Sequence, residues 1–571
     1  MMQEKVMNND RVATLRSGGQ LVVEQIGREG VDSVFCVPGE SFLEVLDALH
    51  DAPTRVIACR QEGGAGYMAD AHARVTGQVG VFMVSRGPGA ANAMVAIHTA
   101  WQDSVPLVLF VGLIARADTY RESFQEFDLN GWFGTTTKAV LRIDYAARVP
   151  ELVARAFYLA RSGRPGPVVV GLPEDMLRER VDVSGVDSIV VEASEPPVSA
   201  LATLAQSLTR ALRPLVLLGG GGWTTEASEQ VRAWAERWAL PVAVDFNCLD
   251  LIDQRSPSFI GTAGYGRIAE VTRAVSAADW VLGIGCPVGD VVTDSWELLP
   301  VYGHDTAITT VLPDTNGLGC AHPGALRITA TPAAFARALA KSPALAEPRD
   351  HSVPERWVAR TRALRDARAA SRRPKRLGGD VDLNAIFTHL AEALPGDAIV
   401  TWGAGNHTGW GARFLNFQGY PSQLSPRNGS MGYGIPAAVA AALAHPERRV
   451  VSVSGDGCFM MNGQELAVAS AHGAAPLIVL LNNSMYGTIR MHQELHHPNR
   501  ASGTVLANPD FAAYARAFGG YGVRVTRTEE FADALAGALA TDTFALIEIV
   551  VPQSVVAPGV ELSDLHRVQP H

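Results

Sequence analysis

Apolar and polar residues alternate along the chain in a pattern that predicts strands followed by helices. Short apolar or β-branched runs, typical of buried strands, occur in the first third at residues 34–37, 56–59, 79–84 and 105–111. Segments with helical spacing lie between them, as at residues 18–28 and 41–50. Strand and helix in regular alternation indicate parallel βαβ units, so we predict an α/β fold.

The same alternation returns twice more. Apolar runs that end in turns occupy residues 214–222, 241–245 and 280–285 in the middle third, and residues 399–400, 450–453 and 476–481 in the last. A chain of 571 residues is too long for one hydrophobic core and suggests about three domains. We expect αβα domains with parallel sheets at residues 1–190, 191–345 and 381–571. Residues 346–380 form a basic linker, and we read its charge run as a solvated helix or linker.

Composition and charge exclude several classes of protein. With 47% hydrophobic and 19% charged residues, the chain is globular and not disordered. A formal net charge of −10 argues against a nucleic-acid partner. No apolar run approaches the roughly 18 residues of a membrane helix, and the first 20 residues lack the apolar core of a secretory signal. The six cysteines are scattered without a CxxC pair, so we predict a cytoplasmic protein with reduced thiols.

Two polar clusters follow neighbouring strands in the last third. Asp456 stands between Gly455 and Gly457 after one strand, and Asn483 follows the next. We expect a loop at residues 455–457 and a short helix at about residues 463–472 between these two strands. The carboxyl ends of parallel strands form the crevice where ligands bind. Glycines allow backbone to approach a phosphate, and carboxylate and amide oxygens suit Mg²⁺. A glycine turn and a capped strand end without any ligand is the alternative.

The spacing of these clusters resembles a known motif. GDG followed by NN, with 27 positions from Asp456 to Asn483, is similar to the diphosphate-binding motif of thiamine diphosphate (ThDP) enzymes. The resemblance implies that Asp456, Asn483 and the main-chain carbonyl of Met485 hold Mg²⁺ on the ThDP diphosphate. It places a further set of residues against the cofactor: Gly455, Gly457, Cys458 and Tyr486.

Glu62 is the candidate acid of the first third. It follows a strand and opens a helix, and its glycine and alanine neighbours leave it poorly solvated wherever another surface packs on it. Such a carboxyl can share a proton, although a glutamate at a helix N-terminus is also favoured by the helix dipole alone.

The segment RQEGGAGYMADAHAR resembles the pyrimidine-domain signature of acetolactate synthase-like ThDP enzymes. The resemblance implies that Glu62 bonds a ring nitrogen of the cofactor's aminopyrimidine and so activates the thiazolium carbon; the difficult chemistry is the cofactor's. One departure is Gln61, where many relatives carry histidine.

Other segments of the first third match the same family. Glu40, in VPGE, stands after a turn where decarboxylases carry an acid and synthases tend to carry glycine; it is either a second acid/base facing substrate or a cap on the helix that begins at Ser41. SFQE and TK are similar to the synthase pattern, which implies that Phe124 and Gln125 line the substrate site with Lys138 near its entrance.

Two segments of the last third complete the expected cofactor site. TWGAGNHTGW resembles the family segment that meets the diphosphate, which implies contacts from Asn406 and His407. RNGSMGYGIP is similar to the loop under the cofactor, where Gly429 would offer its carbonyl to the aminopyrimidine. There Met431 would wedge between the two rings, since an unbranched thioether fills such a gap well; ordinary core packing is the alternative.

The middle third does not carry the expected flavin ligands. Biosynthetic acetolactate synthases bind FAD there through arginines after a strand, and this chain has Pro287 and Val291 at the corresponding positions. Neither can replace an arginine that pairs with a diphosphate, so we predict that FAD is not bound. His492 aligns where synthases that prefer 2-ketobutyrate carry tryptophan, which puts a branched-chain biosynthetic role in doubt.

The resemblance spans about residues 18–552. It implies two ThDP-binding domains, pyrimidine-binding at 1–190 and diphosphate-binding at 381–571, around a Rossmann-like central domain. It also implies a homodimer or homotetramer with active sites between chains. The expected reaction is ThDP- and Mg²⁺-dependent decarboxylation of a 2-oxo acid with transfer of the acyl-anion equivalent to a second carbonyl. A non-ligating decarboxylase or lyase is the alternative, and a non-catalytic subunit is disfavoured because Glu62 is present.

Overall fold

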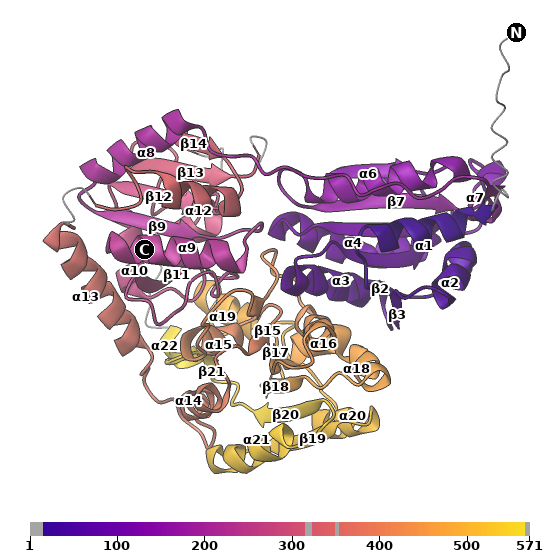
Figure 1. Ribbon diagram of the computed structural model, residues 1–571. Helices are drawn as coiled ribbons and strands as arrows, with labels where there is room; N and C mark the ends of the chain where they lie inside the picture. Colours follow the sequence, from indigo (N-terminus) through magenta and orange to yellow (C-terminus); the bar gives the residue numbers. More distant parts are fainter. Residues whose placement is uncertain (1–14, 315–321, 349–352, 566–571) are drawn as a thin grey trace, which may run out of the picture.

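The computed structural model describes residues 15–314, 322–348 and 353–565. Figure 1 shows three lobes, each built around its own sheet. Each of the three sheets has six strands, and all their strand pairs are parallel. The predicted α/β class with three parallel sheets is therefore confirmed. Residues 1–14, where we expected no secretory signal, and Cys320 lie outside the described ranges.

The N-terminal lobe holds the first sheet. Its strands are, in spatial order, β3 (Arg55–Ala58), β2 (Ser33–Cys36), β4 (Gly80–Ser85), β5 (Leu107–Leu113), β7 (Pro167–Pro173) and β6 (Ala139–Arg142). Its helices are α1 (Gly18–Arg28), α2 (Leu43–His50), α3 (Glu62–Thr76), α4 (Arg86–Asp103), α5 (Leu129–Phe133), α6 (Val149–Arg161) and α7 (Glu174–Arg178). Short strands β1 (Arg16–Ser17) and β8 (Arg180–Val181) form an antiparallel pair. Every residue of β5 is buried, as expected of a parallel strand covered on both faces.

The central lobe has a doubly wound sheet. Its strands are, in spatial order, β11 (Phe259–Ala263), β10 (Val242–Asp245), β9 (Pro214–Leu218), β12 (Trp280–Ile284), β13 (Ala307–Leu312) and β14 (Leu326–Thr329). Its helices are α8 (Val198–Arg210), α9 (Thr225–Arg237), α10 (Ala269–Ser276), α11 (Asp290–Thr293) and α12 (Pro332–Lys341). The strand order reverses between β9 and β12, the arrangement of a Rossmann-like domain.

The basic stretch that we expected to be a solvated helix or linker contains the long helix α13 (Glu355–Ser371). It runs down the outside of the molecule from the central to the C-terminal lobe (Figure 1). Several of its basic side chains pack on the protein: Arg360 donates to the Pro214 carbonyl at 2.7 Å, and the Arg368 guanidinium lies 4.4 Å from the Phe259 ring centre. The prediction of a solvated stretch was therefore wrong for these side chains, because the long apolar part of an arginine side chain can cover apolar surface.

The C-terminal lobe holds the third sheet. Its strands are, in spatial order, β16 (Gln423–Leu424), β15 (Ile399–Thr401), β17 (Val450–Gly455), β18 (Leu477–Asn482), β20 (Ala545–Val550) and β19 (Tyr521–Val525). Its helices are α14 (Leu383–Ala393), α15 (Thr408–Phe414), α16 (Gly434–Ala444), α17 (Asp456–Asn462), α18 (Leu466–His472), α19 (Gly487–His496), α20 (Phe511–Ala517), α21 (Phe531–Leu539) and α22 (Leu562–Leu565). A hairpin of β21 (Val555–Ala557) and β22 (Val560–Glu561) lies near the chain's end.

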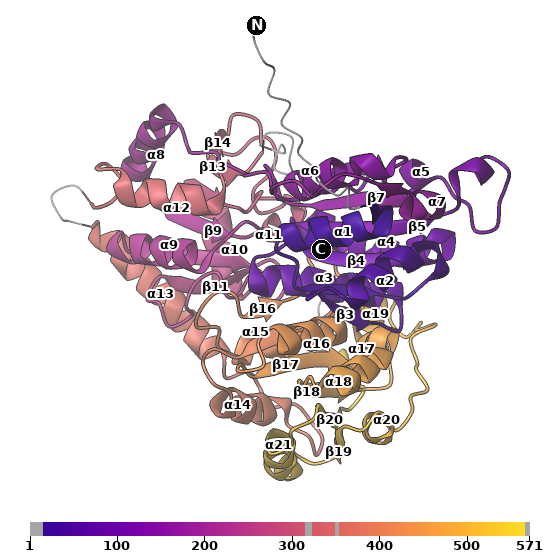
Figure 2. The same ribbon diagram turned by 45° about the vertical axis from the view of Figure 1, so that its right-hand side comes forward.

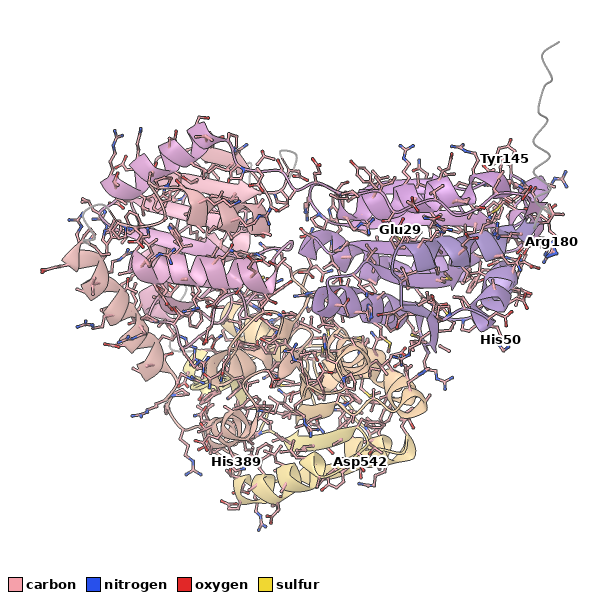
Figure 3. All side chains as sticks on the ribbon, in the orientation of Figure 1. Glu29, His50, Tyr145, Arg180, His389 and Asp542 are labelled. Atoms are coloured by element: carbon pink, nitrogen blue, oxygen red, sulfur yellow. The ribbon has the colours of Figure 1, made fainter. Side chains whose placement is uncertain are left out.

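The N- and C-terminal lobes share one hydrophobic core. Helices α3 and α16 pack together there, and the small side chains Ala69, Ala437 and Ala441 are fully buried between the sheets. Figure 2 shows α3 directly above α16 at this junction. In Figure 3, His50 and Arg180 lie at the outer end of the N-terminal lobe, and His389 and Asp542 lie at the foot of the C-terminal lobe. Within the described ranges, no helix combines the length and apolar character needed to cross a lipid bilayer.

Candidate functional site

A cavity of about 290 Å³ lies at the carboxyl ends of β15, β17 and β18. All the predicted cofactor-binding residues of the last third line it: Asn406, His407, Gly429, Met431, Gly455, Asp456, Gly457, Cys458, Asn483, Met485 and Tyr486. They come from four separate segments that the parallel sheet brings to one edge. That they bind the cofactor remains our prediction.

The first polar cluster forms a tight strand-to-helix turn. We expected a loop at residues 455–457 and a helix from about residue 463, but β17 ends at Gly455 and α17 begins at Asp456. A Cβ on Gly455 would lie 2.9 Å from His407 Nδ1, so any larger residue here would displace the His407 ring. The junction brings the backbone of Asp456 and Gly457 to the cavity wall.

Asp456 is 2% exposed, and its burial raises the pKa of the carboxyl group. The side chain of Asn508 donates to Asp456 Oδ2 at 2.6 Å. A buried carboxylate is costly unless it is paired or coordinates a metal. No group of three or more His, Cys, Asp or Glu side chains suited to a metal occurs in the described part of the chain. A magnesium ion here would therefore share its coordination shell with amide, carbonyl and phosphate oxygens.

The second polar cluster lies beside the first. Strands β17 and β18 pair in register from Val451 with Leu477 to Gly455 with Leu481, so Asp456 and Asn483 follow the ends of adjacent strands. The Asn483 amide oxygen accepts the Met485 N–H at 3.2 Å, which folds the chain back at this point. One carboxylate, one amide and one backbone carbonyl fit a hard cation that is also bound to phosphate.

His407 contributes a polar atom that the protein leaves unsatisfied. The residue is 7% exposed, and Nε2 is buried with no hydrogen-bond partner among the described residues. Burial lowers the pKa of the imidazole to about 4, so the ring is neutral at physiological pH. A buried polar atom without a partner calls for a ligand or water, and a phosphate oxygen would meet this requirement. The residues of this cavity thus fit a diphosphate with its cation.

The wall under the cavity is formed by the loop that carries Gly429 and Met431. Gly429 has φ +68°, a backbone conformation that favours glycine. Cys458 Sγ accepts the N–H of Gly432 at 3.2 Å, which joins this loop to α17. Met431 is half-buried and lines the cavity.

Glu62 lies outside this cavity. It is the first residue of α3, half-buried, and Asn92 donates to its Oε2 at 2.9 Å. Gln61 caps the helix by accepting the Gly64 N–H at 2.8 Å, which gives this departure from the family pattern a structural role. Glu465, from the C-terminal lobe, lies beside this turn: both its carboxylate oxygens accept the Arg60 N–H at 3.2 Å.

The remaining candidates also belong to the N-terminal lobe. Glu40 is exposed at the start of a 3₁₀ turn, Glu40–Phe42, in which no side chain caps the helix. Phe124 is 74% exposed, and Gln125 lines a separate cavity of about 760 Å³. Lys138 donates to the carbonyl of Ser162, and burial lowers the pKa of its amine to about 8. The single chain therefore does not bring these side chains to the cofactor cavity.

Sequence reasoning missed several residues of the cavity. Thr488 Oγ1 accepts the Asn406 N–H at 3.0 Å and donates to Asn406 Oδ1 at 2.9 Å, fixing that side chain. Val555 and Val556, near the end of the chain, line the cavity through the β21 hairpin. Thr488 follows the NN motif closely enough to have been found. By contrast, Asn508 has no local signal, because it reaches Asp456 from 52 positions away.

Comparison with known proteins agrees with this geometry. Three family models match: the thiamine pyrophosphate enzyme N-terminal TPP binding domain at residues 16–132, its central domain at 201–339, and its C-terminal TPP binding domain at 403–549.

Curated relatives match over nearly the whole chain. The acetolactate synthase large subunit of Parasynechococcus marenigrum is 32% identical over 94% of this chain and 87% of its own length. The acetolactate synthase isozyme 2 large subunit of Escherichia coli K12 is 30% identical over 96% of this chain and 99% of its own length. The acetolactate synthase large subunit of Lactococcus lactis subsp. lactis is 30% identical over 94% of this chain and 93% of its own length. The chain therefore belongs to the thiamine diphosphate-dependent enzyme family, as an enzyme of the acetolactate synthase type.

Proposed function

We propose that this enzyme decarboxylates a 2-oxo acid and joins the resulting acyl-anion equivalent to a second carbonyl compound, with acetolactate formation from two pyruvates as the leading case. The observation that carries the proposal is the cavity in which His407, Asp456 and Asn483 converge. The names of the relatives support the same reaction class.

The residues of the cavity would divide the binding of the cofactor between them. Asp456, Asn483 and the Met485 carbonyl would hold Mg²⁺ on the diphosphate. His407 would donate from its neutral ring to a phosphate oxygen, and Asn406 would add a second contact. Gly455, Gly457, Cys458 and Tyr486 form the surrounding wall. When bound, ThDP supplies a carbon nucleophile that adds to the substrate carbonyl.

Glu62 would hold the proton at a ring nitrogen of the aminopyrimidine, while Gly429 would accept from the amino group and Met431 would support the bent cofactor. In one chain the cavity is lined only by described residues of the C-terminal lobe, and Glu62 lies on the N-terminal lobe. This separation supports a homodimer as the smallest active unit, with Glu62 supplied by the partner subunit, and a homotetramer built from such dimers.

Substrate selection falls to the N-terminal lobe in this scheme. Gln125 and Phe124 would face the 2-oxo acid, with Lys138 near the entrance. Glu40 favours a second candidate function, a decarboxylase or lyase that releases an aldehyde, because related decarboxylases carry an acid after this turn and an exposed carboxyl could supply a proton. We place the enzyme in the cytoplasm, in keeping with its free cysteines, all of them buried in the described ranges.

The proposal is tested by product analysis on purified enzyme supplied with pyruvate, Mg²⁺ and ThDP and without FAD. Acetolactate with release of CO₂ is the expected result, and it would also show that flavin is dispensable. Acetaldehyde with CO₂ would replace the carboligase by the decarboxylase. If pyruvate is not consumed, the leading substrate is wrong, and larger 2-oxo acids and acyloins would be assayed in the same way.

A further inference from the structure

The crevice of the central sheet is used as a domain junction. Sheets of this topology usually bind a ligand at the point where the strand order reverses. Here the glycine-rich loops after β9 and β12 are met by Arg164 of the N-terminal lobe and Arg427 of the C-terminal lobe. A Cβ on Gly221 would lie 2.6 Å from the Ser104 carbonyl. The space that remains is about 40 Å³, enough for water but not for a nucleotide.

Arg427 connects all three lobes at this junction. Its side chain is 10% exposed, and its guanidinium pairs with the fully buried carboxylate of Asp245 at the end of β10. Its backbone N–H donates to both oxygens of Asp103, at the end of α4, at 3.1 and 3.2 Å. Asn247 of the central lobe donates to the same Asp103 carboxylate at 2.9 Å.

The segment before Arg427 is fixed to the central lobe in the same way. Asp250 Oδ2 accepts the backbone N–H groups of Ser422 and Gln423 at 2.8 and 3.0 Å. The Gln423 amide donates to the Phe246 carbonyl at 3.3 Å. The loop after β10 thus fixes the edge strand β16 and the short segment that leads from it to Arg427.

The segment after Arg427 is the cofactor loop, residues 428–431. Asn428 donates to Thr99 Oγ1 of α4 at 3.0 Å, and its own side-chain oxygen accepts the Ser430 N–H at 3.1 Å. Gly429 and Met431 follow within four positions of Arg427 and line the cofactor cavity. An arginine at this point locks the loop better than a lysine could, because its planar fork fixes both direction and distance to the carboxylate.

We propose that Arg427 is a positioning residue. Through its ion pair with Asp245, the central domain fixes the positions of Gly429 and Met431 and thereby the site where the aminopyrimidine ring binds. This inference rests on the proposed function, in which those two residues contact ThDP. In this role the central domain supports the cofactor loop without binding a ligand itself.

The test measures ThDP affinity separately from stability. Apoenzyme variants Arg427→Met, Arg427→Lys and Asp245→Asn are titrated with ThDP at saturating Mg²⁺, and the quenching of tryptophan fluorescence gives Kd. The control, Arg267→Met, removes an arginine of similar exposure, 13%, that pairs within the central lobe with the exposed carboxylate of Asp294. We expect Arg427→Met to raise Kd by about tenfold or more and to alter the circular-dichroism band of bound ThDP, with Arg427→Lys in between.

The control should leave Kd within about twofold of wild type, because its ion pair reaches solvent and does not contact the cofactor loop. An unchanged Kd and an unchanged dichroism band in folded Arg427→Met would overturn the inference. If that variant does not fold, the Kd values for ThDP of Arg427→Lys and Asp245→Asn decide instead. An unchanged Kd in both variants would overturn the inference. Failure of the wild-type enzyme to bind ThDP would contradict the proposed function instead, so the two failures are distinguishable.

Discussion

Asn508 Nδ2 lies 2.6 Å from Asp456 Oδ2 and donates to it. The same amide group also donates to Asn482 Oδ1 at 2.9 Å, next to the proposed ligand Asn483. One side chain therefore fixes both strand ends that would hold the cation. Groups that orient metal ligands in this way contribute substantially to affinity without touching the metal.

We expect Asn508→Ala to weaken Mg²⁺ binding about 10- to 100-fold, because the Asp456 carboxylate loses its fixed orientation. The measurement is a titration of apoenzyme and ThDP with Mg²⁺, followed by fluorescence. Asn384→Ala removes an asparagine on α14 that donates to backbone carbonyls, and it should leave the Mg²⁺ affinity unchanged. Equal affinities in all three proteins would show that Asn508 has no part in the site.

The neutral ring of His407 leads to a prediction on affinity and on acid stability. His407→Gln should raise the ThDP Kd by about tenfold, because a buried partner of the diphosphate is lost. The folded-state pKa of about 4 lies below the ordinary value of 6.5, so this residue contributes stability above pH 6.5 that is lost as pH falls toward 4. Melting temperatures of apoenzyme should therefore fall less steeply over this range in His407→Gln than in wild type.

Glu465 should produce the opposite pH dependence. Burial raises the pKa of this carboxyl from 4.5 to about 7. Its contribution to stability is complete below pH 4.5 and is lost as pH rises to about 7, a difference of at most about 3 kcal/mol. Glu465→Gln keeps an oxygen that can accept the Arg60 N–H but cannot ionise. Its melting temperature should therefore decline less than that of wild type between pH 4.5 and 7, and identical declines would contradict the assignment.

Local patterns were sufficient to predict much of the fold. The helix expected at residues 18–28 is α1 (Gly18–Arg28), whose start is fixed by a capping box between Ser17 and Gln20. The two polar clusters could be placed together because adjacent parallel strands end at the same sheet edge. Signals of this kind depend on spacing within a few tens of residues.

Contacts between distant segments could not be predicted in the same way. Asn508, Glu465 and the pair of Arg427 with Asp245 depend on how whole domains pack. The pair of glycines around Asp456 predicts a loop, whereas the structure passes directly from β17 into α17 there. The charge run of α13 indicates a solvated segment, and it carries no signal for the surfaces on which Arg360 and Arg368 pack.

The central claim is that Glu62 activates ThDP, and hydrogen–deuterium exchange at the thiazolium carbon of bound cofactor tests it without knowledge of the substrate. We predict that Glu62→Gln binds ThDP with unchanged Kd and that exchange, and turnover with it, falls at least about 100-fold. The matched variant Glu40→Gln should exchange at the wild-type rate. Exchange in ThDP-saturated Glu62→Gln that is as fast as in wild type would contradict the account.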